Sequence, residues 1–145
     1  MKLVINGCYG GFSLSPKGER LYLERQGKQL FRYKQTSYMH ESGKEEYARI
    51  DDDSDPSFSY SFTKDYGKLA DKKTLWENRE ETYFYGGDLK RDDPDLVAIL
   101  EEHGPDIISG SCAYLEIVEI PDDVEWEIDE YDGMESIHEK HRVWQ

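Results

Sequence analysis

The stretch DPDLVAILEEHGP, residues 93–105, carries the clearest structural signal in the chain. Asp93 is a favourable N-cap residue, and a proline directly after it suits the first helical position because its missing N–H would have no partner there. Apolar side chains then recur three and four residues apart, at Leu96, Val97, Ile99 and Leu100. The Gly104-Pro105 pair ends the pattern. The stretch predicts a helix over residues 94–103 with one buried face.

Strand patterns lie on both sides of this helix. Residues 113–120 and 124–129 are rich in apolar and β-branched side chains and flank a Pro-Asp-Asp turn. Further strands are predicted at residues 2–6, 29–34, 58–62 and 82–85, and a second helix is predicted over residues 16–26. We therefore expect an α+β fold, a mainly antiparallel sheet with two or three short helices packed on it.

The length of 145 residues is typical of one domain, so we expect residues 1–145 to form a single domain. Residues 36–57 and 63–81 are polar and show no clear apolar period, which predicts irregular connections there, with room for a helical turn in one of them. The chain contains 11 Tyr, 5 Phe and 3 Trp, too many aromatic residues for a disordered protein. These side chains are expected to build the core.

The net charge of −14 belongs entirely to the last third of the chain. Residues 1–90 contain 15 acidic and 15 basic side chains, whereas residues 91–145 contain 17 acidic and three basic ones. Such a charge repels a phosphate backbone, so we expect no direct binding of nucleic acid.

Because the acidic residues lie on predicted strands, they are expected to form a negative surface on a folded protein. Such a surface can bind a basic groove on a partner protein, although many acidic surfaces serve solubility alone. The candidate partner-binding residues are Glu119, Asp122, Asp123, Glu125, Glu127, Asp129 and Glu130. A homodimer is also possible, with Trp144 as a candidate contact.

A glycine-rich loop, Cys8-Tyr9-Gly10-Gly11, follows the first predicted strand. Glycines allow backbone N–H groups to point at an anion, and the following helix N-terminus would add a favourable dipole. Cys8, Tyr9, Gly10 and Gly11 are therefore candidate ligand-binding residues. The alternative is a tight strand-to-helix turn, and the loop lacks both the phosphate-loop ending and the dinucleotide spacing.

Three other patterns suggest chemistry but have simpler explanations. Cys8 could act as a nucleophile with His103, His138 or His141 as its base, although a lone cysteine after a strand is more often a buried filler. His138 and His141 could share a metal on a C-terminal helix, but two nitrogen ligands are too few. The acidic run 51–55 resembles a calcium loop, yet Pro56 and Phe62 occupy its two most constrained positions. We therefore expect no metal or other cofactor and no catalytic residue.

The cysteines and the lack of a long apolar run indicate the cellular compartment of the protein. Cys8 and Cys112 are expected to be free thiols, because no signal peptide precedes them. No run approaches the roughly 18 apolar residues that a membrane span requires, so we expect a soluble intracellular protein.

Several blocks of the sequence together resemble a known family. They are VINGCYGGFSLS (residues 4–15), RDDPDLV (91–97) and VEIPDDVEWEI (118–128), followed by Tyr131-Asp132-Gly133. In these blocks the chain resembles a family of small uncharacterised proteins encoded by tailed phages and prophages. The resemblance covers both ends, roughly half of the chain, and implies expression in the cytoplasm of a bacterial host. It provides no catalytic residues.

The sequence thus favours a non-enzymatic phage accessory protein. We expect it to bind a host cytoplasmic protein, for instance a defence component, through its acidic C-terminal surface. The alternative is a binder of a nucleotide or another small molecule, or an enzyme, that uses the glycine loop at residues 8–11. A structural role in the phage cycle is a third hypothesis.

Overall fold

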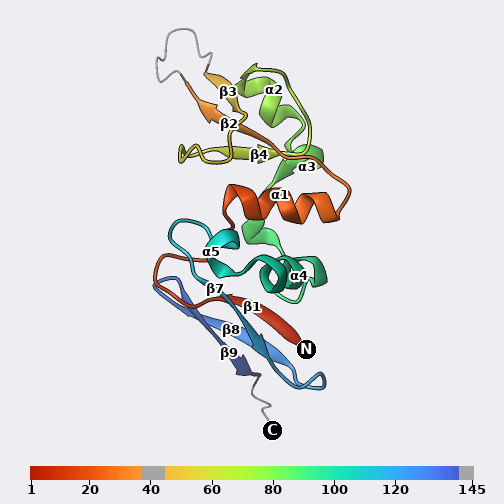
Figure 1. Cartoon of the computed structure of the whole chain (residues 1–145), viewed down its shortest axis with the longest axis vertical. Helices are drawn as coiled ribbons and strands as arrows, with labels where there is room; N and C mark the ends of the chain where they lie inside the picture. Colours follow the sequence, from red (N-terminus) through yellow and green to blue (C-terminus); the bar gives the residue numbers. More distant parts are fainter. Residues whose placement is uncertain (37–44, 141–145) are drawn as a thin grey trace, which may run out of the picture. The chain divides into compact units, whose positions relative to one another are not determined.

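The computed structural model describes residues 1–36 and 45–140. The chain divides into two compact units (Figure 1). Unit 1 combines residues 1–22 with the chain from Gly86 onward, and unit 2 is the intervening segment 23–85. Both units contain helices and antiparallel strands, so the fold is α+β, as the sequence predicts.

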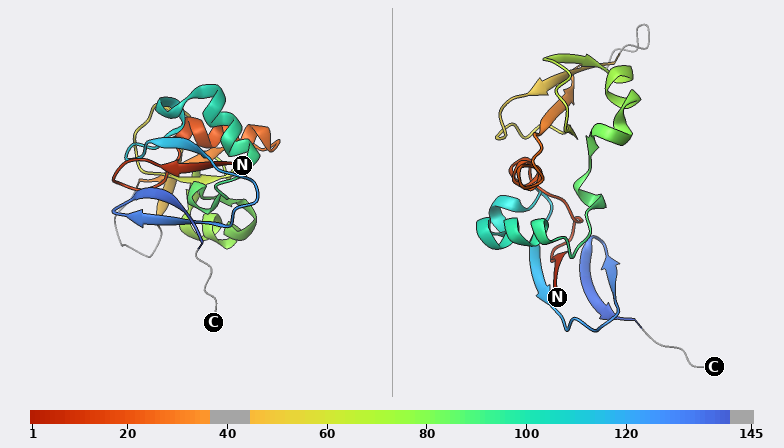
Figure 2. Two further views of the ribbon diagram at one scale, coloured as in Figure 1. Left: turned by 90° about the horizontal axis from the view of Figure 1, so that it is seen from below. Right: turned by 90° about the vertical axis from the view of Figure 1, so that its right-hand side faces the viewer.

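The strands of unit 1 come from the two ends of the chain. β1 (Lys2–Asn6) pairs antiparallel with β7 (Leu115–Glu119), and β8 (Trp126–Tyr131) forms a hairpin with β9 (Met134–Glu139). β1 also packs next to β9. The spatial order is therefore β7, β1, β9, β8, with β8 at one edge (Figure 2).

Helices cover one side of the β1 and β7 pair. α4 (Pro94–His103) has the bounds that the sequence predicts, and the Asp93 carboxylate accepts hydrogen bonds from the Asp95 and Leu96 amides at its N-terminus. Its apolar face packs against β1 and β7, and the short α5 (Pro105–Ile108) follows directly. α1 (Pro16–Arg25) begins in unit 1, where the Gly18 amide donates to the Ser15 hydroxyl. A single 3₁₀ turn, η2 (Gly86–Asp88), opens the C-terminal part of this unit.

The hairpin of β8 and β9 corrects one prediction. The sequence suggested a helix around His138, but His138 lies on β9. The chain reverses through Asp132 and Gly133, both with positive φ (53° and 89°), between the paired residues Tyr131 and Met134. An Asp-Gly pair is a strong signal for a two-residue hairpin turn, and it outweighs the weak helical spacing that follows it.

Unit 2 is built on one five-stranded antiparallel sheet with the order β5, β3, β2, β4, β6. The strands are β2 (Phe31–Gln35), β3 (Glu46–Ile50), β4 (Tyr60–Phe62), β5 (Leu69–Asp71) and β6 (Tyr83–Phe84). Two short helices, α2 (Lys72–Glu77) and α3 (Arg79–Thr82), connect β5 to β6. The Asp71 carboxylate caps α2 by accepting from the Thr74 amide.

Aromatic side chains form the core of this second unit, as the composition suggests. Tyr33, Tyr47 and Phe62 are buried together with Ala70 and Leu75. The rings meet edge to face, for example Tyr33 and Phe62 with centroids 5.9 Å apart. The Tyr33 hydroxyl is hydrogen-bonded in this core: it donates to the Gly67 carbonyl and accepts from the Tyr66 amide.

The stretches predicted to be irregular contain regular structure. β3 lies within residues 36–57, and β5 and α2 lie within residues 63–81. Each is short, and each buries only one or two side chains, such as Tyr47 in β3 and Ala70 in β5. Because charged residues surround these few apolar positions, the sequence shows no apolar period. The strands among these elements are stabilised by pairing with strands distant in sequence.

Candidate functional site

The seven predicted partner-binding carboxylates follow one another along a continuous piece of unit 1. They begin at the end of β7, continue through the connecting loop and extend along β8, and we call residues 119–130 the acidic segment. All seven side chains are exposed: Glu119, Asp122, Asp123, Glu125, Glu127, Asp129 and Glu130. No lysine or arginine occurs between Asp92 and Glu139 in the sequence. The acidic segment therefore presents a high density of negative charge to solvent.

Among the described residues, the cations near this segment lie at its β7 end and across the hairpin, and Lys2 is paired opposite Glu119. Asp122 forms an ion pair with the amino group of Met1, which lowers the pKa of its carboxyl. Asp129 Oδ2 lies 3.2 Å from His138 Nε2 across the hairpin. The exposed Asp123, Glu125, Glu127 and Glu130 can attract a positively charged surface within the screening length of about 8 Å at physiological ionic strength.

His138 does not belong to a catalytic triad. Its Nε2 atom lies 2.9 Å from the Ser136 hydroxyl and 3.2 Å from the Asp129 carboxylate, so both neighbours meet the same ring nitrogen. A triad requires the carboxylate on one nitrogen and the nucleophile on the other. All three side chains are also exposed.

Among the described residues no group of three or more His, Cys, Asp or Glu side chains is arranged to hold a metal ion. His141, the second histidine of the suggested metal pair, lies outside the described residues, as does Trp144.

The glycine-rich loop packs directly against the turn of the β8–β9 hairpin. The Gly10 amide donates to the Asp132 carbonyl at 3.2 Å. A Cβ atom added to Gly133 would lie 2.3 Å from the Gly11 nitrogen and 2.6 Å from the Gly10 nitrogen. The backbone of the turn therefore lies directly against the Gly10 and Gly11 amides, and the Asp132 carbonyl takes up the Gly10 amide. A Cβ atom at Gly10 would lie 2.3 Å from the Cys112 carbonyl oxygen, and both Gly10 and Gly11 have positive φ, so the turn alone accounts for these glycines. Ligand binding by residues 8–11 stays a prediction.

A buried polar network fixes this contact. Asn6 is fully buried, and its side-chain amide donates to the carbonyls of Cys8 and Gly133, both at 2.7 Å. Its carbonyl oxygen accepts from the Tyr114 amide at 2.8 Å. Asn6 thus joins three separate segments of unit 1. The sequence alone does not single out Asn6, although a polar side chain at the end of an otherwise apolar strand is a recognisable signal.

The Cys8 thiol is part of the same packing. It lies 3.5 Å from Asn6 Oδ1 and 3.5 Å from the carbonyl oxygen of Cys112. Both cysteines are free thiols, as expected, with Cys8 half-buried and Cys112 exposed. No histidine is among the hydrogen-bond partners of Cys8 in the described part of the chain. The arrangement provides no base for a Cys8 nucleophile.

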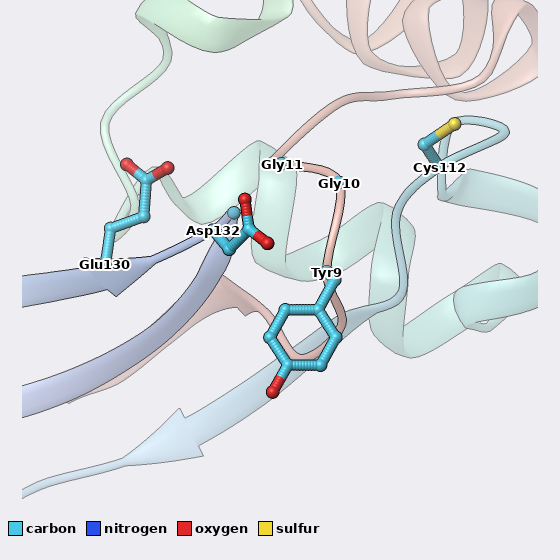
Figure 3. A pocket seen from close by; sticks show the side chains of 7 residues that line it. Tyr9, Gly10, Gly11, Cys112, Glu130 and Asp132 are labelled. Carbon is cyan, nitrogen blue, oxygen red and sulfur yellow. The ribbon is translucent and has the colours of Figure 1, made fainter.

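An open hollow of about 620 Å³ lies beside this contact (Figure 3). It is lined by Tyr9, Gly10, Gly11, Cys112, Glu130, Asp132 and Gly133. The hollow brings Tyr9 and both loop glycines, predicted to bind a ligand, together with Glu130, predicted to bind a partner. Cys8 does not line it. In Figure 3 the Tyr9 ring, the Glu130 carboxylate and the Cys112 thiol point in different directions.

In the acidic run of unit 2, the carboxylates of Asp52 and Asp55 are hydrogen-bonded within their own turn. Asp52 Oδ1 accepts from the amide and the hydroxyl of Ser54, and Asp55 accepts from the Ser57 amide and pairs with Lys34. The buried Arg32 side chain donates to the Asp52 and Asp55 carbonyls. These bonds use the oxygens that a calcium ion would need, in agreement with the interpretation as a solvated turn.

No protein-family model, curated protein sequence or solved structure matches this chain. In the described residues no helix has both the length and the apolar character needed to cross a membrane.

Proposed function

We propose that this protein is a non-enzymatic binding protein whose acidic segment captures a basic partner protein. The observation that carries the proposal is the exposure of all seven carboxylates along residues 119–130, without a lysine or arginine among them. The resemblance to phage proteins suggests that the partner belongs to the bacterial host, and a defence component is one such partner. The protein would then act in the host cytoplasm.

Charge complementarity explains how the acidic segment would select its partner. A dense row of carboxylates raises the association rate with a basic surface and repels acidic proteins. The basic surfaces of host proteins commonly serve to bind nucleic acid. A protein with this segment would therefore compete with nucleic acid for the same surface, and high salt would weaken the complex.

The packing around the segment is consistent with a rigid binding surface. β8 is held by the hairpin with β9, and the turn of that hairpin is held by Asn6 and the glycine loop. A preorganised surface loses little conformational entropy on binding. The carboxylates of β8 therefore have fixed spacing before the partner arrives.

The hollow supports a second candidate function, the binding of a small molecule. Its lining includes the carboxylates of Glu130 and Asp132 beside the exposed Tyr9 ring. These groups favour a small cation over a nucleotide, since they would repel phosphate. A rise in melting temperature with a panel of polyamines, absent in Asp132→Asn, would favour this function.

Affinity capture with a charge-reversed variant tests the first function. Tagged protein is incubated with bacterial lysate, and the bound proteins are identified and quantified at several salt concentrations. The variant Glu125→Lys, Glu127→Lys, Asp129→Lys should lose a stoichiometric, salt-sensitive partner. The control Glu77→Lys, Glu80→Lys, Glu81→Lys changes the charge equally at exposed positions of unit 2 and should retain it. Equal capture by both variants would show that the acidic segment is not the binding surface.

A further inference from the structure

β8 lies at a free edge of the strands in unit 1. Its neighbour on one side is β9, and in the part of the chain that the structure describes no other strand pairs with it. In the spatial order β7, β1, β9, β8, its other side faces away from the unit (Figure 2). An unpaired strand edge presents backbone donors and acceptors that can pair with another chain.

The register of the hairpin identifies the outward backbone groups. The Lys140 amide donates to the Glu125 carbonyl at 2.9 Å, so Glu125 directs its backbone groups toward β9. Alternate residues of an antiparallel strand direct these groups to opposite sides. Those of Glu127, Asp129 and Tyr131 therefore also face β9. The N–H and C=O groups of Trp126, Ile128 and Glu130 face the open edge.

The side chains beside this edge alternate in the same way. Glu127 and Asp129 project from one face of β8 and are exposed, whereas Trp126 and Ile128 are half-buried on the other face. Residues two apart on a strand are separated by about 7 Å. The edge thus combines three outward pairs of backbone groups with carboxylates at a regular spacing.

This combination restricts what can occupy the edge. A second β8 strand would place like charges opposite each other, which disfavours pairing between two copies of the chain. A strand with lysine or arginine at alternate positions would instead bring a cation opposite each carboxylate. Backbone pairing would supply affinity and the charges would supply selectivity, as in other complexes formed by strand addition.

We infer that the edge of β8 binds an extended basic segment of the partner as an added β-strand, with alternating lysine or arginine residues opposite Glu127 and Asp129. The inference rests on the proposed function, since it specifies how the acidic segment recognises its partner. It adds that the backbone of the partner, and not its charge alone, takes part in recognition.

Two synthetic peptides of equal charge test the inference. One alternates lysine with threonine, and the other alternates lysine with proline. Proline cannot donate to a strand ladder, but it preserves the charge and its approximate spacing. The first peptide should bind at least tenfold more tightly, and on binding it should slow the hydrogen exchange of the Trp126, Ile128 and Glu130 amides. The variant Glu127→Lys, Asp129→Lys should bind neither peptide.

The outcomes separate the inference from the proposed function. Equal affinity for both peptides, without protection of the three amides, would overturn strand addition, whereas loss of this binding in the charge-reversed variant would still support charge-driven capture. Failure of the lysine-threonine peptide to bind would also overturn the inference. The lysate experiment tests the proposed function independently, because it makes no assumption about strand pairing.

Discussion

Arg91 and Glu135 form a bidentate ion pair inside unit 1. Arg91 Nη1 lies 2.5 Å from Glu135 Oε1, and Nη2 lies 2.8 Å from Oε2. The Glu135 side chain is 7% exposed, and its Oε1 atom also accepts from the Asn6 amide. The Arg91 guanidinium lies over the Phe12 ring, 3.7 Å from its centroid. One ion pair therefore links β9, β1 and the segment that precedes α4.

Removal of this carboxylate should be costly. Glu135→Ala leaves the Arg91 charge and the Asn6 amide without their acceptor in a buried site. Breaking a buried pair in this way costs about 3–5 kcal/mol of unfolding free energy. Urea unfolding followed by circular dichroism measures the change. Glu139→Ala, at an exposed position of the same strand, should change stability by less than about 0.5 kcal/mol. A similar small effect of both variants would contradict a structural role for the ion pair.

Gly133→Ala should destabilise unit 1 more than Gly104→Ala. Both glycines have similar positive φ angles, 89° and 85°, so alanine is strained at each. A Cβ at Gly104 meets nothing within 4 Å, whereas one at Gly133 would lie 2.3 Å from the Gly11 nitrogen. The clash should add about 1–3 kcal/mol to the conformational cost. Comparison of the two unfolding free energies isolates the effect of the close approach, and equal values would disprove it.

Phe62→Ala should unfold the second unit, and Phe58→Ala should not. Phe62 is fully buried among Tyr33, Tyr66 and Trp76, whereas Phe58 is 79% exposed. Truncation of a buried phenylalanine costs about 3–5 kcal/mol. Hydrogen exchange of the β2 and β4 amides reports on this unit directly. Rapid exchange in the Phe58 variant would indicate that the rim of the aromatic cluster matters as much as its centre.

Acid should loosen the turn that contains Asp55. Hydrogen bonds from the Ser57 hydroxyl and amide, with the Lys34 ammonium, lower the pKa of Asp55 from 3.8 to about 2. Because the pKa is lowered in the folded state, the stabilisation is fully present above pH 3.8 and is lost as the pH falls toward 2. Asp55→Asn should reduce this acid-dependent loss. Urea unfolding between pH 6 and pH 2 measures it, and an unchanged pH dependence would show that Asp55 is not responsible.

Local signals predicted much of the fold. The N-cap at Asp93, the apolar stripe and Gly104 defined α4, and the apolar run 2–6 defined β1. In these segments the local pattern and the tertiary contacts agree. β3 and β5 were missed because their sequences are mostly polar and they depend on pairing with distant partners. β9 is obscured in the sequence because His138 and His141 have helical spacing, although an Asp-Gly turn precedes them.

The candidate site could be predicted only in part. The acidic segment is evident in the sequence because seven carboxylates in twelve residues form a local pattern. In the structure all seven side chains are exposed. The roles of Asn6, Arg91 and Glu135 depend on contacts between residues up to 129 positions apart. No local pattern encodes such contacts. For the same reason the sequence could not show that the hairpin turn at Gly133 packs against the glycine loop at residues 10 and 11.

The pairing of β1 with strands from the far end of the sequence has a consequence for synthesis on the ribosome. Residues 23–85 contain every strand of their sheet and can fold once they emerge. β1 is made before these residues, yet β7 and β9 are made after them. Its apolar residues, Leu3, Val4 and Ile5, therefore have no partner strand until β7 and β9 have been translated as well. During that interval β1 is an unpaired apolar segment, the kind of surface that aggregates or binds chaperones during folding.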